Sequence, residues 1–276
     1  MEKYKTLEIV RASSNSQVIN LYLNRQSVRN ALSSDFFSEF PRALSSLDQD
    51  PNVRVIILSG HGDHFCAGID LSTLKDSFAN TTSNDDRGRS GERIRQSIKG
   101  LQAAITALER CRKPVIAGIH GGCIGGGIDL VTGCDIRYCT EDSFFSVKEV
   151  DLAIVADLGT LQRLPGIVGF GNAMELALTG RKFSGLEAKS FGLVSRVFGS
   201  KSAMDEGLVG LAEGIAEKSP LAVNGTKAVL LRSRDLTLDQ GLDYVATWNS
   251  VVLQSNDLAE AVSAQIQKRK PVFAKL

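Results

Sequence analysis

A run of glycines directly after an apolar segment is the feature that most constrains this chain. Residues 121–127 read Gly-Gly-Cys-Ile-Gly-Gly-Gly, and residues 114–119 before them read Pro-Val-Ile-Ala-Gly-Ile. The pattern predicts a buried strand, then a tight turn, then the start of a helix. Because glycine has no Cβ, the backbone of such a turn can approach a ligand and point its N–H groups at it. We therefore expect an anion or oxyanion to bind at this helix N-terminus.

A second glycine turn lies at residues 64–70, His-Phe-Cys-Ala-Gly-Ile-Asp, after the β-branched run 53–58. We expect both turns at the carboxyl edge of one sheet, since each follows a predicted strand. Two N–H groups that converge there on one carbonyl oxygen would form an oxyanion hole. Each such donor is worth about 2.7–4 kcal/mol of transition-state stabilisation. The alternative is that both segments are ordinary tight turns.

The remaining pattern predicts an α/β protein with a helical C-terminal part. Strand and helix patterns alternate from residue 53 onward, which implies right-handed βαβ units, and residues beyond 159 are mainly helical. We expect a core over residues 1–200 and a helical region over residues 201–276, as one structural unit. The individual elements predicted are a hairpin from Leu7–Val10 and Val18–Leu23, a helix over 34–47 kinked or broken at Pro41, and an exposed polar loop over 76–91.

Composition excludes several classes of protein. The chain has 32 Lys and Arg against 31 Asp and Glu, so nothing favours nucleic acid as a partner. No segment reaches the roughly 18 apolar residues of a membrane span. The five cysteines are odd in number and lack CxxC spacing, which argues against a disulfide framework and a structural zinc site.

Motifs for other chemistries are missing from the sequence. The glycine run does not have the G-x-G-x-x-G spacing of a dinucleotide site, and there is no G-x-x-x-x-G-K-[ST] phosphate loop. No G-x-S-x-G elbow is present, which argues against a serine hydrolase. The three histidines have no metal-ligand spacing, so no metal site is expected.

Three acids follow the second glycine run: Asp129, Glu149 and Asp157. Asp129 and Asp157 each stand among apolar residues, and an acid in such surroundings has a raised pKa and can exchange protons near neutrality. For each acid taken alone, a capped turn or a buried salt bridge is the alternative. Asp157 in particular could be the N-cap of the next helix.

These residues together resemble the crotonase (enoyl-CoA hydratase/isomerase) superfamily. The motifs that carry the resemblance are residues 64–70, residues 121–129 and Cys-Asp-Ile-Arg at 134–137, and it extends from Asn30 to the basic residues 268–270. It implies a ββα spiral core with a helical C-terminal part that is used in oligomerisation. It also implies an acyl-CoA substrate and assembly as trimers or as hexamers made of two trimers.

The family pattern implies roles for the two turns. The N–H groups of Ala67 and Gly126 would form the oxyanion hole for the thioester carbonyl. The acyl-CoA would lie along the same turns, and the substrate-binding residues expected from the resemblance are Ala67, Gly68, Ile69, Asp70 and Gly125.

The acids resemble those of the dienoyl-CoA isomerase branch of this family. Typical hydratases carry a Glu where Asp129 stands and no acid where Asp157 stands. By resemblance, Asp157 removes the α-proton of a 3,5-dienoyl-CoA and Glu149 delivers a proton to the sixth carbon. Asp129 would position and tune Glu149 or the diene. No metal or redox cofactor is implied, because coenzyme A is part of the substrate.

The last three residues, Ala274-Lys275-Leu276, resemble the Ser-Lys-Leu peroxisomal address. They predict a peroxisomal location and binding to the import receptor, which agrees with β-oxidation of unsaturated fatty acids. Two alternatives share the fold: a 2-enoyl-CoA hydratase or 3,2-enoyl-CoA isomerase, favoured by Glu149, and a non-catalytic acyl-CoA-binding protein.

Overall fold

A six-stranded sheet forms the centre of the molecule in the computed structural model, which describes residues 3–79 and 86–276. Its strands have the order β1-β2-β3-β4-β6-β9, and only the β1–β2 pair is antiparallel. The bounds are β1 (Leu7–Arg11), β2 (Val18–Leu23), β3 (Val55–Gly60), β4 (Val115–Ile119), β6 (Ile136–Thr140) and β9 (Arg196–Phe198). The predicted N-terminal hairpin and the two predicted central strands are therefore present.

A second, three-stranded sheet lies beside the first, with the order β5-β7-β8. It consists of β5 (Gly122–Ile124), β7 (Phe144–Ser146) and β8 (Phe183–Ser184). Successive strands alternate between the sheets: β4 is followed by β5 and then helix α4 (Gly126–Gly133), and β6 is followed by β7. This alternation is the expected ββα spiral. It also corrects the prediction that the turn after β4 leads straight into a helix, because β5 pairs with β7 before the helix begins.

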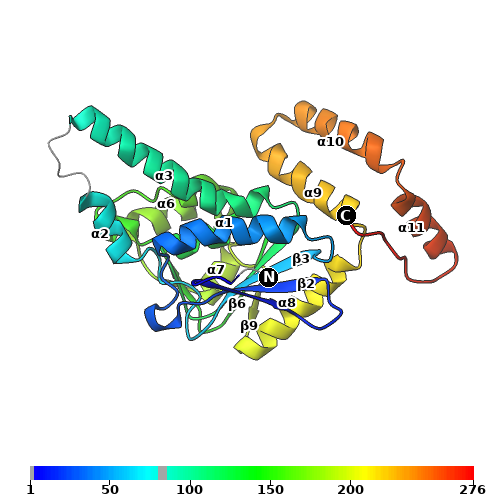
Figure 1. Cartoon of the computed structure of the whole chain (residues 1–276), viewed down its shortest axis with the longest axis horizontal. Coiled ribbons are helices and arrows are strands. Elements are labelled where there is room, and N and C mark those ends of the chain that lie inside the picture. Colours follow the sequence, from blue (N-terminus) through cyan, green and yellow to red (C-terminus); the bar gives the residue numbers. More distant parts are fainter. Residues whose placement is uncertain (1–2, 80–85) are drawn as a thin grey trace.

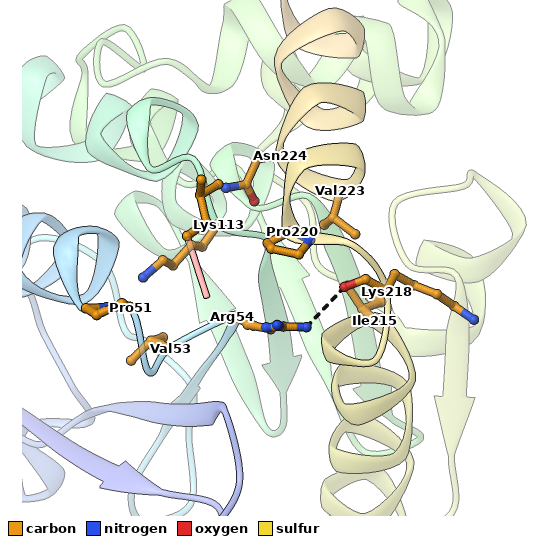
Figure 2. A pocket seen from close by; sticks show the side chains of 10 residues that line it. Pro51, Val53, Arg54, Lys113, Ile215, Lys218, Pro220, Val223 and Asn224 are labelled. Carbon is orange, nitrogen blue, oxygen red and sulfur yellow. Dashed lines mark hydrogen bonds between the residues drawn. The ribbon is translucent and has the colours of Figure 1, made fainter. Parts of the chain in front are cut away.

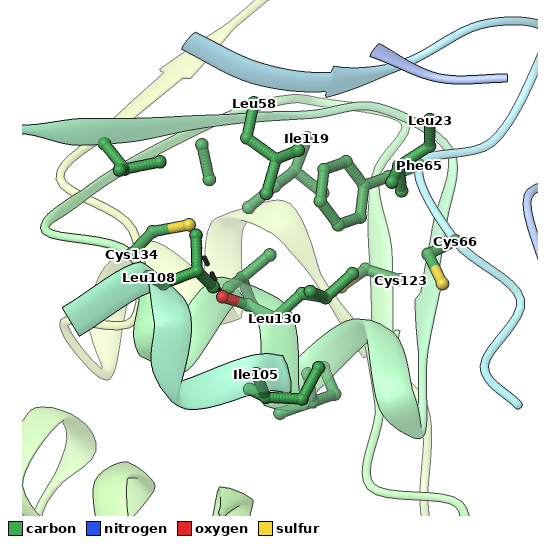
Figure 3. Close-up of a cluster of buried hydrophobic side chains, with 14 of the residues drawn as sticks. Leu23, Leu58, Phe65, Cys66, Ile105, Leu108, Ile119, Cys123, Leu130 and Cys134 are labelled. Atoms are coloured by element: carbon green, nitrogen blue, oxygen red, sulfur yellow. Dashed lines mark hydrogen bonds between the residues drawn. The ribbon is translucent and has the colours of Figure 1, made fainter. Parts of the chain in front are cut away.

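Helices cover both faces of the large sheet (Figure 1). On one side lie α1 (Ser34–Gln49), α3 (Arg87–Arg110) and α4, whose side chains share a buried cluster with Leu58 and Phe65. Figure 3 shows Ile105 and Leu108 of α3 and Leu130 of α4 in this cluster. On the other, α8 (Lys201–Ala216) buries Met204 and Leu208 against Val55 and Ile116. The remaining core elements are η1 (Gln26–Val28), α2 (Leu71–Ala79), η2 (Glu149–Leu152), α5 (Thr160–Val168), α6 (Phe170–Thr179) and α7 (Gly185–Ser190).

Two local features differ from the prediction: α1 is not broken at Pro41, and residues 76–91 are not all loop. Helix α1 runs through Pro41 without a break, and its buried phenylalanines Phe36, Phe37 and Phe40 offset the one backbone hydrogen bond that proline cannot donate. The predicted loop over 76–91 is helical at both ends, since α2 extends to Ala79 and α3 begins at Arg87. The rest of that prediction, residues 80–85, lies outside the described residues.

The last helices form an arm that projects from the core (Figure 1). The arm consists of α9 (Pro220–Arg232), η3 (Ser233–Asp235), α10 (Leu238–Val252) and α11 (Asn256–Ile266). Its first helix is held by the buried Lys227, which pairs with Asp135 at 2.8 Å and donates to the carbonyls of Leu108 and Lys113 at 3.0 Å. The domain boundary predicted at residue 200 stays a prediction. Helix α8, directly after it, packs on the sheet, so the projecting part begins with α9.

A small pocket lies where the arm leaves the core (Figure 2). There the Arg54 side chain donates to the carbonyls of Ala216 and Lys218 at the end of α8, and to those of Phe273 and Ala274. None of the predicted site residues lines this pocket, so it belongs to the junction between arm and core.

Candidate active site

The two glycine turns predicted from the sequence lie side by side. We call residues 61–70 the upstream turn and residues 120–126 the downstream turn. Cys66 and Cys123 form a parallel bridge, in which Cys66 N–H donates to Gly122 and Ile124 N–H donates to Cys66, both at 3.0 Å. The backbone of the upstream turn thus extends the small sheet at β5. This pairing brings the ends of both turns together, as the oxyanion interpretation requires.

Two glycines permit the close approach of these turns. Gly68 has φ +95°, and a Cβ there would lie 3.0 Å from the carbonyl oxygen of Ile124. Gly125 has φ +51° and directly precedes α4. Both backbone conformations are ones that side-chain-bearing residues rarely adopt. A substitution at either position would therefore separate the turns or distort the start of α4.

The oxyanion donor predicted at Ala67 is wrong. Its N–H already donates to the carbonyl of Arg29 at 2.9 Å, in the segment after η1. Two residues later, the N–H of Ile69 has no acceptor among the described residues. In the bridge to Leu32, the bonds are made by the neighbouring residues: Leu32 N–H donates to the Gly68 carbonyl, and Asp70 N–H donates to the Leu32 carbonyl. Ile69 therefore offers a backbone donor at the end of the upstream turn that lies nearest α4.

Gly126, the second predicted donor, has a position that suits this role, which stays a prediction. It is the first residue of α4, so its N–H is one of those that a helix leaves unpaired at its N-terminus. A Cβ at Gly126 would lie 3.6 Å from the nitrogen of Ile69, which places the two backbone donors next to each other. Ile69 lies in the bridge to Leu32, and Gly126 lies between β5 and α4, so both donors belong to ordered backbone. Such preorganised donors suit an oxyanion.

Asp129 lies one helical turn after Gly126 and is 1% exposed. One of its carboxylate oxygens, Oδ1, accepts two hydrogen bonds from Thr160, from N–H and from Oγ1, both at 2.7 Å. Burial raises the pKa of Asp129 to about 6, although these hydrogen bonds lower it. Asp129 therefore caps the first turn of α5, although it lies 31 residues earlier in the chain. A capped turn was the alternative to a catalytic role for this acid, and the structure shows such a cap.

Glu149 begins η2 and faces the downstream turn. A Cβ on Gly125 would lie 3.3 Å from its Oε1, and its Oε2 is buried with no partner among the described residues. Burial, together with the negative charges of Asp129 and Asp157, raises the pKa of Glu149 to about 7. A buried carboxyl with one unused oxygen and such a pKa can hold a proton at neutral pH.

Asp157 is the most accessible of the three acids. Its side chain is exposed in the single chain, and desolvation still raises its pKa above the ordinary value. It is not the N-cap of α5, a position taken by Gly159. Because the charge of Asp157 raises the pKa of both Asp129 and Glu149, the three acids occupy one site.

Asp70 has structural partners at the end of the upstream turn. Its carboxylate pairs with Arg25 at 2.9 Å and accepts from the N–H and hydroxyl of Ser72 in the first turn of α2. The Ser72 hydroxyl and Arg25 lower the pKa of Asp70. Asp70 therefore holds the end of the upstream turn against Arg25 and caps the start of α2. Its predicted role in substrate binding stays a prediction.

Sequence reasoning missed two residues of this site. Thr160 is fully buried and supplies both hydrogen bonds to Asp129. Arg163, one turn later on α5, pairs with Glu109 at 2.7 Å, and its charge lowers the pKa of Asp129. The predicted helix start after Asp157 was a signal that could have pointed to Thr160, because the first N–H groups of a helix need an acceptor from elsewhere.

Among the described residues, neither the cysteines nor any cluster of metal-ligating side chains adds to this site. The five cysteines are free and buried. Within residues 3–79 and 86–276, no group of three or more His, Cys, Asp or Glu is placed to hold a metal ion, and no helix is long and apolar enough to cross a membrane.

Comparison with known proteins agrees with this geometry. The family model described as enoyl-CoA hydratase/isomerase matches residues 13–275. The chain belongs to the enoyl-CoA hydratase/isomerase family. The crystal structure of an enoyl-CoA hydratase from Bacillus anthracis superposes with a TM-score of 0.87 at 31% identity, over 98% of this chain and 99% of that one. The predicted crotonase-like α/β fold is thereby confirmed.

Within the family, the curated relatives include dienoyl-CoA isomerases. One, named Delta(3,5)-Delta(2,4)-dienoyl-CoA isomerase, peroxisomal, from Arabidopsis thaliana, is 70% identical over 276 residues, which is all of this chain and 99% of the relative. A mitochondrial enzyme of the same name from Mus musculus is 44% identical over 267 residues, 96% of this chain and 81% of the relative.

Proposed function

We infer that this chain is a Δ3,5-Δ2,4-dienoyl-CoA isomerase that acts in β-oxidation of unsaturated fatty acids in the peroxisome. The observation that carries the inference is the meeting of three acids of raised pKa beside two unused N–H groups. The isomerase name and the peroxisomal location both come from the 70% identical relative. The import receptor predicted to bind Ala274-Lys275-Leu276 stays a prediction.

The oxyanion step is assigned to the backbone. Removal of a proton from the α-carbon of a 3,5-dienoyl thioester spreads negative charge over a conjugated dienolate and onto the thioester oxygen. The N–H groups of Ile69 and Gly126 donate to that oxygen. Since both are held in place before the reaction, they stabilise the charge as it develops at no reorganisation cost.

The two proton transfers are assigned to different acids. Asp157, the more accessible acid, starts as a carboxylate and takes the α-proton. Glu149, with a pKa of about 7, starts protonated and delivers its proton to the sixth carbon. The C–H bond at C2 breaks and one forms at C6, so the double bonds move from positions 3 and 5 to 2 and 4. Asp157 is then protonated and Glu149 ionised, and exchange with water resets both.

Asp129 is assigned a tuning role. Its Oδ1 is occupied by Thr160, so it is not free to carry protons through that atom. Its charge favours the protonated form of Glu149, which is the form that delivery to C6 requires.

No metal or redox cofactor is required by these steps, because each is a proton transfer. We expect activity to survive dialysis against EDTA without loss. A dependence on an added metal ion would contradict this proposal.

The arm is proposed to join copies of the chain. Its helices α10 and α11 expose large apolar side chains: Leu238, Leu242, Val251, Leu258, Val262 and Ile266. The core exposes apolar side chains as well, on η2, α6 and α7: Leu152, Phe170, Met174, Leu178 and Leu186. An arm that seats on the core of the next copy gives a head-to-tail contact, which closes into a ring.

The size of the assembly tests this contact. Light scattering is expected to give three or six times the 29.7 kDa of the chain. The double substitution Val262→Glu and Ile266→Glu on α11 is expected to give monomers. A monomeric wild type would contradict the proposal.

The function is tested by incubating the protein with a 3,5-dienoyl-CoA and following the long-wavelength absorbance of the 2,4-dienoyl product. Water addition to a 2-enoyl-CoA at a comparable rate would instead favour a hydratase. Tight binding of acyl-CoA with no turnover of either substrate would favour a binding protein.

A further inference from the structure

Two histidines outside the acid site link the upstream and downstream turns by reciprocal contacts. His64 of the upstream turn accepts the N–H of Gly122 at Nδ1, at 2.9 Å. His120 of the downstream turn bonds through Nε2 to the carbonyl of Gly62 at 2.8 Å. Each imidazole therefore reaches the backbone of the other turn.

These contacts fix the proton positions on both rings. An N–H points at Nδ1 of His64, so that nitrogen is unprotonated and the ring is neutral with its proton on Nε2. A carbonyl accepts from Nε2 of His120, so His120 carries its proton there. Its Nδ1 is buried and has no partner among the described residues, and burial lowers the pKa of His120.

The space between the turns is filled by the His64 ring. A Cβ at Gly121 would lie 2.1 Å from the carbonyl oxygen of Asp63 and 2.7 Å from His64 Nδ1. The other side of the ring meets Phe144 on β7 edge to face, with centroids 6.1 Å apart at 80°. The ring thus has one orientation, with Nδ1 directed at the Gly122 N–H.

His64 links the upstream and downstream turns, which carry the N–H groups of Ile69 and Gly126. Its partner Gly122 opens β5, four residues before Gly126, and His64 itself lies five residues before Ile69. Between these points the segments are joined by the hydrogen bonds between Cys66 and β5. The relative position of the donors therefore depends on this pairing, and a misplacement of about 1 Å near the reacting atoms can cost about 100-fold in rate.

We propose that His64 is a positioning residue of the oxyanion hole, which as a neutral acceptor for Gly122 N–H holds the Ile69 and Gly126 donors in register. The role rests on the isomerase function proposed above. His64 acts only through the backbone and makes no contact with the acids in this assignment.

Three variants test the role by steady-state kinetics. His64→Leu removes the acceptor, and we expect kcat to fall about 10- to 100-fold with KM nearly unchanged, because a misplaced donor weakens the transition state more than the bound substrate. His64→Asn places an amide oxygen close to the former Nδ1, and we expect it to recover most of kcat. His61→Leu is the matched control: that imidazole belongs to the same turn but pairs with Glu8 and stacks on Tyr22, so wild-type kcat is expected.

An infrared measurement separates positioning from mere stability. The carbonyl stretch of a bound 2,4-dienoyl-CoA is expected to shift to lower wavenumber on wild type, less on His64→Leu, and again fully on His64→Asn. His64→Gln, whose amide oxygen lies one bond further out, serves in place of His64→Leu if that variant does not fold, and its shift is expected to be reduced.

Unchanged kcat and carbonyl shift in folded His64→Leu would overturn the proposal. So would His64→Asn behaving like His64→Leu, which would point to ring packing against Phe144. If wild type converts no diene, the isomerase function fails, and the carbonyl shift alone then decides the role of His64.

Discussion

At the scale of single residues, burial divides three similar carboxyl groups into three roles. Asp129 is buried and bonded to Thr160, Glu149 is half-buried with one buried oxygen that has no partner among the described residues, and Asp157 is exposed in the single chain. Desolvation is the largest cause of the raised pKa in each case. The environment of each carboxyl group, more than its residue type, therefore separates the proposed acid from the proposed base.

Stability should depend on pH through Glu149. Its pKa is about 7 in the folded chain against 4.5 unfolded, so the folded state holds an extra proton between these values. The free energy of unfolding should therefore fall as pH rises from 4.5 to 7, by up to about 3 kcal/mol. Urea unfolding of wild type and Glu149→Gln at pH 5 and pH 8 measures this. The variant should lose less stability than wild type over that interval, and parallel losses would contradict the pKa.

The correction from Ala67 to Ile69 can be tested atom by atom. Replacing Ile69 by its α-hydroxy acid exchanges the N–H for an ester oxygen and leaves the side chain in place. We expect kcat to fall about 10²–10³-fold, the usual loss for one oxyanion donor. The same replacement at Ala67 removes only the bond to Arg29 and serves as the control. A larger loss of kcat at Ala67 would restore the original prediction.

At the scale of elements, the Asp129 carboxylate of α4 binds the first residue of helix α5. Thr160 opens α5 and gives both its N–H and its hydroxyl to Asp129. The loop that carries Asp157 ends at this point, so the contact also fixes how the proposed base approaches the site. Losing the hydroxyl would leave Asp129 buried with one fewer donor.

Thr160→Val is expected to destabilise the fold by about 1.5–3 kcal/mol, the range for a buried hydrogen bond to a charged group. It should also lower kcat, because the pKa of Asp129 rises and Asp157 is less firmly placed. Thr160→Ser retains the hydroxyl and is the control for both effects. Thermal unfolding and the dienoyl assay measure them, and equal behaviour of the two variants would refute the link.

At the scale of the whole molecule, a buried ion pair joins the arm to the core. Lys227 of α9 reaches into the core, where Asp135 and two carbonyls surround its ammonium group. The side chains of Lys227 and Asp135 are 7% and 20% exposed, so either left alone would be a poorly solvated charge.

Lys227→Met is expected to lower the free energy of unfolding by about 3–5 kcal/mol and to loosen the arm. Adding Asp135→Asn should recover part of the loss, since the unpaired charge is then gone. Urea unfolding of the two single variants and the double variant gives the coupling energy. Strictly additive effects would show that the pair does not anchor α9.

Much of this architecture could be predicted from local pattern. The glycine turns, the central strands and the three acids are each encoded within about ten residues, so their types and order were accessible from the sequence. The contacts that depend on distant segments were not. The carbonyl of Arg29 accepts from the Ala67 N–H across 38 residues, and β5 forms by pairing with β7 and with Cys66, both distant in sequence.

The same distinction applies within the candidate site. Asp129 and Thr160 are separated by 31 residues, and no local signal links them. The helical ends of the polar stretch 76–91 were missed because its composition resembles that of a loop. The sequence shows which residue types are present, and the structure adds which distant residues each of them contacts.

The central claim is that Asp157 takes a proton from C2 and Glu149 returns one to C6. The most direct test is incubation of a 3,5-dienoyl-CoA with each variant in D₂O, followed by mass spectrometry of the recovered substrate. Glu149→Gln retains the base but cannot complete the transfer, so deuterium should enter C2 without formation of the 2,4-diene. Asp157→Asn should give neither deuterium at C2 nor product. Exchange at C2 by Asp157→Asn, with none by Glu149→Gln, would contradict the account.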